Sequence, residues 1–138
     1  MKCEIISVGD ELLIGQTINT NSSWLGEQLN NLGFTIGHGL VISDQKTDIV
    51  NALRQAENRS DIVLITGGLG PTNDDITKHT LTEYFNTTLE LNKEIEQNII
   101  DYFTSRNLPI LQTNKDQALI PKSCQVLPNN RGSASGMW

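Results

Sequence analysis

The sequence predicts an α/β fold in which a mainly parallel sheet carries helices on both faces. Strand-like and helix-like segments alternate along the chain, the run at residues 61–65 is short, apolar and β-branched, and a glycine-rich loop follows it. Continuous apolar runs are typical of strands buried on both faces, as in parallel sheets. Alternation of strands with helices indicates βαβ units.

The first half of the chain supplies three of the expected strands. They lie at residues 3–8, 34–42 and 61–65, and apolar spacing predicts a helix at residues 22–32, which Gly33 ends. A second helix is indicated by apolar residues at helical spacing, namely Ile49, Ala52, Leu53 and Ala56. Residues 9–11 are expected to form a turn, whereas residues 12–20 show no clean period.

The second half is expected to be mostly helical. We predict helices at residues 74–86 and 94–105, a short helix at 115–119, a short strand at 125–127 and a glycine-containing loop at 129–136. A length of 138 residues suits a single domain covering residues 1–138. Because Trp138 directly follows a loop, we also expect the sequence to be a piece of a longer protein.

Composition narrows the classes of partner. There are 16 acidic and 10 basic residues and no basic cluster, so binding to nucleic acid or an anionic membrane is not expected. No apolar stretch approaches the roughly 18 residues of a membrane span, and the start is unlike a signal peptide, so the expected location is cytoplasmic. Cys3 and Cys124 lack metal-site spacing, and Cys3 is expected to be a buried apolar residue.

The loop at residues 66–75 has the chemistry of a phosphate-binding turn. Gly67, Gly68 and Gly70 permit positive φ angles and place no Cβ in the way of a ligand. Backbone amides can then face an anion, and the start of the following helix adds a positive partial charge of about +0.5. The order Gly-Gly-x-Gly is neither the dinucleotide fingerprint nor a Walker loop, so the loop alone does not identify the ligand.

Asp74 and Asp75 have two interpretations. Thr72 and Asp75 fit a capping box at the start of the next helix. Alternatively, one carboxylate holds a divalent cation beside the ligand phosphates, as Mg²⁺ is often held. A cap needs only one acid, so the pair favours the ligand interpretation.

Other acids also follow strand ends. Asp10, Glu11 and Asp44 are each ordinary turn or helix-start residues when taken singly. If the loops converge, however, these carboxylates crowd together and repel unless a cation neutralises them. His38 and His79 have no ligand spacing and are expected to be structural or solvated. The aromatic residues at helical positions are expected in the core: Trp24, Tyr84, Phe85, Tyr102 and Phe103.

Four segments resemble the N-terminal domain of the competence/damage-inducible CinA family, which belongs to the molybdopterin-binding superfamily. They lie at residues 9–16, 19–21, 66–77 and 132–138 and read GDELLIGQ, NTN, TGGLGPTNDDIT and GSASGMW. The resemblance implies a three-layer α/β/α sandwich with a mostly parallel, mixed sheet. It also implies a small-molecule nucleotide or pterin ligand and a homo-oligomer.

The resemblance further implies an activity. In CinA-like proteins this domain is associated with ADP-ribose pyrophosphatase activity that uses a divalent metal (Mg, Mn or Co). The alternatives are molybdopterin binding or adenylyl transfer, as in molybdenum-cofactor biosynthesis, and a ligand-binding module without turnover.

Site residues follow from the matching motifs. Asp75, Asp74 and Asp44 would be catalytic, and Asp75, Asp74, Asp10 and Glu11 would hold the metal. Phosphate or pterin contacts would come from Thr66, Gly67, Gly68, Gly70, Pro71, Thr72, Asn21, Ser133 and Gly136. The last loop departs from the family, since Asn130-Arg131 replaces Asn-Pro and Ser135 stands in place of a proline. Because proline would fix φ, this loop is expected to be less rigid.

Overall fold

A computed structural model describes residues 1–72 and 76–138 of the chain. These residues form two compact units, Met1–Gly68 (unit 1) and Leu69–Trp138 (unit 2), and each unit is described by itself. The expectation of one domain over residues 1–138 stays a prediction. In the described part of the chain, no helix is both long enough and apolar enough to cross a membrane.

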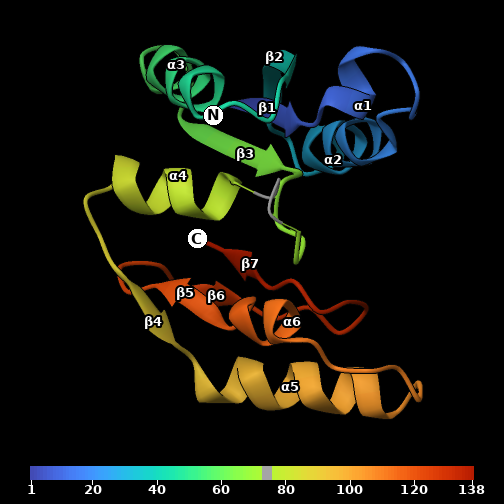
Figure 1. Cartoon of the computed structure of the whole chain (residues 1–138). Coiled ribbons are helices and arrows are strands. Elements are labelled where there is room, and N and C mark those ends of the chain that lie inside the picture. Colours follow the sequence, from blue (N-terminus) through green and yellow to red (C-terminus); the bar gives the residue numbers. More distant parts are fainter. Residues whose placement is uncertain (73–75) are drawn as a thin grey trace. The chain divides into compact units, whose positions relative to one another are not determined.

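Unit 1 is built around a three-stranded parallel sheet (Figure 1). Its elements follow one another as β1 (Lys2–Val8), α1 (Asp10–Leu13), α2 (Thr20–Asn31), β2 (Thr35–Ile42), α3 (Lys46–Glu57) and β3 (Ile62–Thr66). The strand order is β2-β1-β3, with β1 in the centre. The α/β fold with a parallel sheet is therefore confirmed.

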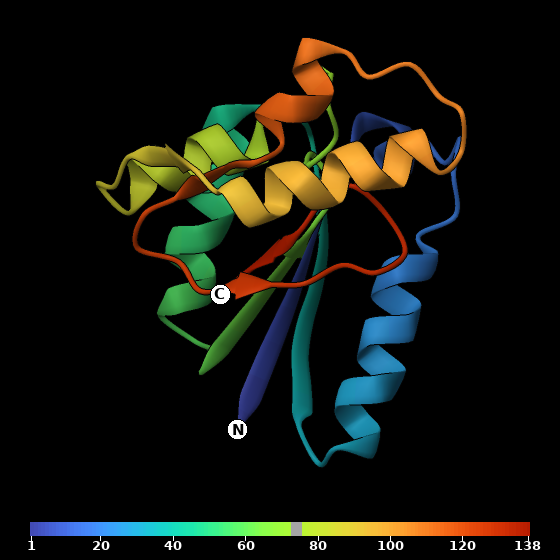
Figure 2. The same cartoon turned by 90° about the horizontal axis from the view of Figure 1, so that it is seen from below.

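The two main helices of unit 1 cover opposite faces of this sheet. The connection through α2 leads from β1 to its neighbour β2, whereas the connection through α3 leads back across β1 to β3. Right-handed connections that run in opposite directions along a sheet place their helices on opposite faces. Figures 1 and 2 show α2 and α3 on opposite sides of the strands.

The core of unit 1 is supplied by β1 and α3. Buried β1 side chains include Cys3, Ile5, Ile6 and Val8, as expected for a central strand. The four α3 residues noted for their helical spacing, Ile49, Ala52, Leu53 and Ala56, are all buried. In contrast, α2 has no buried residue, and Trp24 is 60% exposed, so its prediction as a core residue is wrong.

A buried ion pair ties β1 to the segment before β3. The Glu4 side chain is fully buried, and it accepts hydrogen bonds from Arg59 Nη2 at 2.6 Å, Arg59 Nε at 2.9 Å and Ser60 Oγ at 3.2 Å. His38 Nδ1 lies 3.8 Å from Glu4 Oε2, which agrees with a structural role for this histidine. The Arg59 hydrogen bonds lower the pKa of Glu4, although burial acts in the opposite direction.

Unit 2 combines helices with two antiparallel strand pairs. Its elements are α4 (Thr77–Tyr84), β4 (Leu89–Leu91), α5 (Lys93–Thr104), α6 (Gln112–Asp116), β5 (Leu119–Pro121), β6 (Val126–Leu127) and β7 (Gly136–Met137). Strand β4 pairs with β5, and β6 pairs with β7. The buried cluster consists of Ile95 and Ile99 from α5 together with Ala118 and Ile120.

Several predicted boundaries in unit 2 are wrong. Helix α4 has Ile76 as its N-cap, so Thr72 is not a capping residue of this helix. Helix α6 begins before the predicted 115–119 segment because Asn114 Oδ1 accepts from Leu111 N at 2.9 Å, and Leu119 belongs to β5. Gly136 lies in a strand rather than a loop, and Phe85 is 58% exposed rather than buried.

Candidate functional site

The carboxyl ends of all three parallel strands lie at one edge of the unit 1 sheet. Val8 of β1 is aligned with Ile42 of β2, and Ser7 of β1 is aligned with Thr66 of β3. Gly9 N continues this alignment by donating a hydrogen bond to Ile42 O at 3.0 Å. Ligands of α/β sheets bind at this edge. We call the loops that follow the three strands, at residues 9–11, 43–44 and 67–68, the carboxyl edge.

Asp10 and Asp44 are brought together at the carboxyl edge by reciprocal hydrogen bonds. Asp10 N donates to Asp44 Oδ2 at 3.4 Å, and Asp44 N donates to Asp10 Oδ1, also at 3.4 Å. Asp10 is an exposed residue in the first turn of α1, and Asp44 follows the end of β2. The two carboxylates therefore sit close together although 34 positions separate them in the sequence.

Glu11 takes a different place from the other two acids. A Cβ added to Gly9 would lie 2.5 Å from Glu11 Oε1, so this carboxylate folds back over its own loop. Among residues 1–72 and 76–138, no three His, Cys, Asp or Glu side chains form a group suited to a metal ion. Asp74 and Asp75, two of the expected metal ligands, lie outside the described residues.

The glycines after β3 have a steric reason to be glycine. Gly67 has φ +99°, and a Cβ placed on it would lie 2.0 Å from the carbonyl oxygen of Val8. Gly68 also has a positive φ of 62°. No other residue type fits at Gly67 without moving β1 or β3, because the obstructing atom belongs to the main chain. The remaining expected contacts of this loop, Gly70, Pro71 and Thr72, are exposed residues at the start of unit 2.

Two asparagines of the segment at residues 19–21 connect α2 to the strand ends. Asn21 Nδ2 donates to Thr66 Oγ1 at 3.4 Å, so both expected ligand contacts lie together at the end of β3. Asn19 caps α2 by accepting from Ser22 N at 3.1 Å, and its Nδ2 donates to the buried Ser7 Oγ at 2.9 Å. No role was expected for Asn19 itself, although a cap residue preceding a helix is a recognisable signal.

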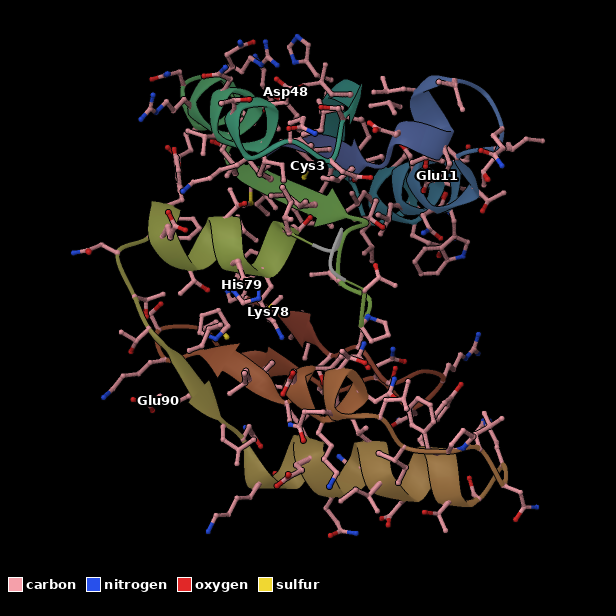
Figure 3. The ribbon with its side chains drawn as sticks, in the orientation of Figure 1. Cys3, Glu11, Asp48, Lys78, His79 and Glu90 are labelled. Atoms are coloured by element: carbon pink, nitrogen blue, oxygen red, sulfur yellow. The ribbon has the colours of Figure 1, made fainter. Side chains whose placement is uncertain are left out.

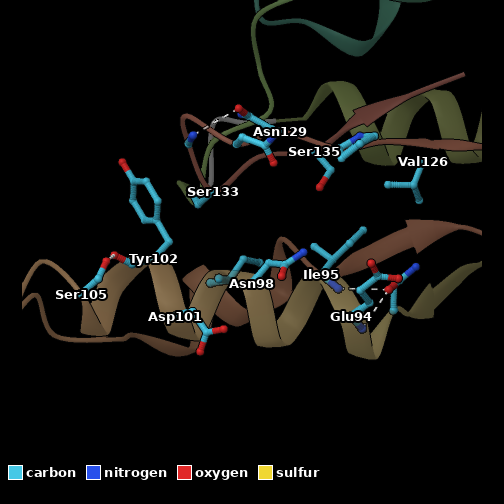
Figure 4. Close-up of a pocket in the computed structure, with 15 residues that line it drawn as sticks. Glu94, Ile95, Asn98, Asp101, Tyr102, Ser105, Val126, Asn129, Ser133 and Ser135 are labelled. Atoms are coloured by element: carbon cyan, nitrogen blue, oxygen red, sulfur yellow. Dashed lines mark hydrogen bonds between the residues drawn. The ribbon is translucent and has the colours of Figure 1, made fainter.

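The two expected contacts from the last loop lie in unit 2. Ser133 lines a cavity of about 540 Å³ between α5 and residues 128–135 (Figure 4). Gly136 pairs with Leu127 in the β6–β7 ladder, and a Cβ there would lie 3.0 Å from Leu127 Cβ. Close strand packing therefore explains a glycine at position 136.

Unit 2 also contains polar groups that the sequence did not indicate. Gln117 Nε2, from the residue after α6, donates to Leu69 O at 3.4 Å, within unit 2. Lys78 projects from α4 (Figure 3), donates to Asp116 O at 3.1 Å, and has its pKa lowered by burial. Within the described residues, Thr77 Oγ1 and Gln117 Oε1 are buried without a hydrogen-bond partner, which is uncommon. No sequence spacing signals these long-range contacts.

Comparison with known protein families gives a match over almost the whole chain. A family described as a probable molybdopterin binding domain matches residues 4–138. A CinA-like protein of Flavobacterium psychrophilum is 51% identical over 100% of this chain and 33% of its own length. A putative competence-damage inducible protein of Clostridium acetobutylicum is 43% identical over 99% of this chain and 33% of its own. The chain thus spans about a third of these relatives.

Solved structures show the same relationship. The crystal structure of the protein CinA from Thermoplasma acidophilum is 32% identical, covers 99% of this chain and 79% of its own, and has a TM-score of 0.85. The molybdopterin biosynthesis enzyme MoaB from Thermus thermophilus is 19% identical and covers 87% of this chain and 78% of its own, with a TM-score of 0.57. At this identity the comparison shows similarity of fold alone. The chain therefore belongs to the molybdopterin-binding domain family, as a CinA-like N-terminal domain.

Proposed function

We propose that this domain hydrolyses the pyrophosphate of a nucleotide of the ADP-ribose type, with a divalent metal (Mg, Mn or Co) held at the carboxyl edge. The observation that carries the proposal is the reciprocal pairing of Asp10 with Asp44 beside the Gly67-Gly68 turn. This pair brings acids from two different loops together at the strand ends where α/β domains bind ligands.

The Asp10–Asp44 pair fits a hard divalent cation. Mg²⁺ is commonly bound through one or two carboxylates together with substrate phosphates, rather than by a cage made wholly of protein. Asp10 accepts one hydrogen bond through Oδ1, which leaves most of the lone pairs of this carboxylate able to ligate. Ligation by Asp74 and Asp75, and by Glu11, stays a prediction that the resemblance supports. A bound metal would polarise a phosphoryl oxygen and supply a hydroxide nucleophile.

Electrostatics also supports a requirement for metal. The chain has a net charge of −6, and the Asp10 and Asp44 carboxylates lie at the same edge as the glycine turn. A pyrophosphate that approached this edge without a cation would meet like charge. The turn itself contributes backbone amides, and the absence of a Cβ at Gly67 and Gly68 allows close approach of phosphate oxygens.

A second candidate is molybdopterin binding, with adenylyl transfer or with no turnover at all. The family match over residues 4–138 favours it, since that family is described by molybdopterin binding. The same carboxyl edge would then hold the phosphate of the pterin. A homo-oligomer, and a partner list without nucleic acid or membrane, stay predictions for either activity.

The test is release of AMP from ADP-ribose by the purified chain in the presence of Mg²⁺, Mn²⁺ or Co²⁺. Asp44→Asn and Asp75→Ala are expected to lower the metal-dependent rate at least tenfold. Asp61→Asn is the matched control, because Asp61 Oδ2 accepts from Lys2 N at 2.7 Å at the opposite end of the sheet. Full activity of Asp44→Asn, or no release by the folded chain with any of the metals, would overturn the proposal and favour molybdopterin binding.

A further inference from the structure

We propose that unit 2 has a small-molecule site of its own, in the cavity between α5 and residues 128–135, and that its ligand is an uncharged, ring-shaped molecule of the nucleoside class. We call this space the α5 cavity. Its volume of about 540 Å³ lies in the range of roughly 300–1,000 Å³ that is usual for small-molecule sites. The inference goes beyond the proposed function, since no residue of the carboxyl edge lines this cavity. Ser133, for which the resemblance implies a phosphate or pterin contact, is assigned to this second site instead.

The floor of the α5 cavity is apolar and fixed. Ile95 and Ile99, which line it, are 5% and 1% exposed and belong to the buried cluster of unit 2. Val126, which packs against the same cluster, extends the floor. An apolar surface backed by a packed core suits the face of a flat ring.

The wall opposite α5 is held in shape by one side chain. Asn129 Oδ1 accepts from Arg131 N at 2.9 Å and from Gly132 N at 3.2 Å, while Asn129 Nδ2 donates to Ala134 O at 2.7 Å. The carboxamide therefore organises the turn before any ligand arrives, even though the family's proline is replaced by Ser135. Such preorganisation lowers the cost of binding.

Uncharged polar groups face the cavity from both sides. Asn98 and Tyr102 rise from α5 toward the opposite wall, and Ser135 points back toward the helix (Figure 4). Within the described part of the chain, no hydrogen bond occupies the side-chain polar atoms of Asn98, Tyr102, Ser133 or Ser135. A carboxamide offers both donors and an acceptor, and asparagine pairs with the donor and acceptor edge of a nucleobase. The serine and tyrosine hydroxyl groups can in turn bind the hydroxyl groups of a sugar.

The charge of the lining argues against a phosphorylated ligand. The only acidic residues in its lining are Glu94 and Asp101, and no Lys or Arg lines the cavity. Asp101 points away from the opposite wall in Figure 4, and its Oδ1 accepts from Gln97 Nε2 at 2.9 Å. Arg106 stacks 3.8 Å from the centre of the Tyr102 ring and donates to Tyr102 O, so it fixes this aromatic side chain from outside the lining. An uncharged nucleoside is thus favoured over its nucleotide.

The test is a titration of the ¹⁵N-labelled 138-residue chain with adenosine, followed by amide chemical shifts. Saturable shifts are expected in α5 and residues 128–135, and AMP is expected to bind there more weakly than adenosine. Asn98→Ala and Ser135→Ala should each weaken adenosine binding about two- to tenfold, the usual effect of one lost hydrogen bond. Thr104→Ala, on α5 but outside the lining, should leave the affinity unchanged.

A separate variant keeps this site distinct from the carboxyl edge. Asp44→Asn should bind adenosine in the α5 cavity as the unaltered chain does, whatever its effect on AMP release. The spectra also report whether each variant is folded. The proposal is overturned if millimolar adenosine shifts no amide of α5 or residues 128–135, or if both Asn98→Ala and Ser135→Ala bind it with unchanged affinity.

Discussion

Carboxylates at the two ends of the parallel sheet in unit 1 differ in burial and in their hydrogen-bond partners. Near the amino end, Glu4 is fully buried, and Arg59 and Ser60 donate hydrogen bonds to it. At the carboxyl edge, Asp10 and Asp44 are not buried and are held together by each other's main-chain amides. A buried carboxylate that accepts several hydrogen bonds has a structural role in the fold. Like charges gathered where water and ligands reach them are suited to binding a cation.

The space available for a side chain at glycine positions also differs along the sheet. Gly67, at the end of β3, touches the main chain of β1, whereas Gly39, in the middle of β2, has nothing within 4 Å of the Cβ it lacks. Glycine is therefore required for close approach at the carboxyl edge but not within the strand. Substitutions at the two positions should differ accordingly in their effect on stability.

Replacing Gly67 by alanine is expected to destabilise the chain most. The new Cβ would lie 2.0 Å from Val8 O, and φ is +99°, so β1 and β3 would have to move apart. We expect a loss of more than about 3 kcal/mol in the free energy of unfolding, because strain and overpacking add. Urea unfolding followed by circular dichroism measures this loss.

Gly39→Ala is the matched control for that experiment. It makes the same chemical change in the same sheet, and the resulting free energy should stay within about 1 kcal/mol of the original. Equal losses for the two variants would show that the close approach of Gly67 to Val8 is not what requires glycine there.

Glu4→Gln tests the amino end and is expected to cost about 2 kcal/mol, the scale of hydrogen bonds to a charged group. The pKa of Glu4 is lowered below its ordinary value of 4.5, chiefly by the Arg59 hydrogen bonds. A lowered folded-state pKa gives stability that is present above pH 4.5 and is lost as the pH falls through the lowered pKa. The difference between the two chains should therefore be constant from about pH 6 to about pH 8 and shrink on acidification below about 4.5.

Unfolding curves at a series of pH values measure this difference. Glu57→Gln, at the end of α3, provides a control carboxylate that is exposed. A gap for Glu4→Gln that widens in acid would have the opposite sign to the expected one and show that the Arg59 hydrogen bonds do not stabilise the charged form.

Asn19→Ala separates architecture from binding within the carboxyl edge itself. The variant loses the α2 cap to Ser22 N and the hydrogen bond to the buried Ser7 Oγ. We expect a loss of about 1–2 kcal/mol, as for other N-cap substitutions. Asn31→Ala, at the exposed end of α2, should leave the thermal midpoint nearly unchanged. If the two midpoints fall together, the Asn19 contacts contribute no more than a surface asparagine.

The sequence predicted the parallel sheet well and the remainder less well, for identifiable reasons. Strands β1 and β3 bury or half-bury apolar runs with β-branched residues, and such runs are visible without knowledge of their partners. Strand β2 is mostly exposed and contains two glycines, so its apolar signal was weaker. Strands β4, β5 and β7 have only two or three residues and exist through pairing with distant segments. Helical spacing predicted that Trp24 lies in the core, but the face of α2 that carries Trp24 is not covered within unit 1.

The candidate site divides in the same way. Strand-loop order was enough to bring Asp10, Asp44 and Gly67 to one edge, because parallel strands end together. The order of strands and loops along the sequence could not show that Glu11 folds back over Gly9, or that Gln117 contacts Leu69. Both contacts depend on side-chain conformation and long-range packing. The roles expected for Asp74 and Asp75 concern residues outside the described part and stay predictions.

Among these substitutions, Asp44→Asn should have the smallest effect on stability, in contrast to Glu4→Gln. Asparagine keeps an oxygen that can accept from Asp10 N, and it removes one of two adjacent negative charges. The free energy of unfolding without metal should change by no more than about 0.5 kcal/mol.

The effect of a metal ion on the thermal midpoint should show the role of the negative charge that Asp44→Asn removes. A cation that binds the folded chain raises its thermal midpoint by mass action, so millimolar Mn²⁺ should stabilise the original chain and Asp61→Asn. Asp44→Asn should gain much less, because one ligand of the pair has lost its charge. Equal shifts for all three chains would place the cation elsewhere and leave the Asp10–Asp44 pair without the role assigned to it. A selective loss would show that the carboxyl edge keeps two like charges together for a cation rather than for the stability of the fold.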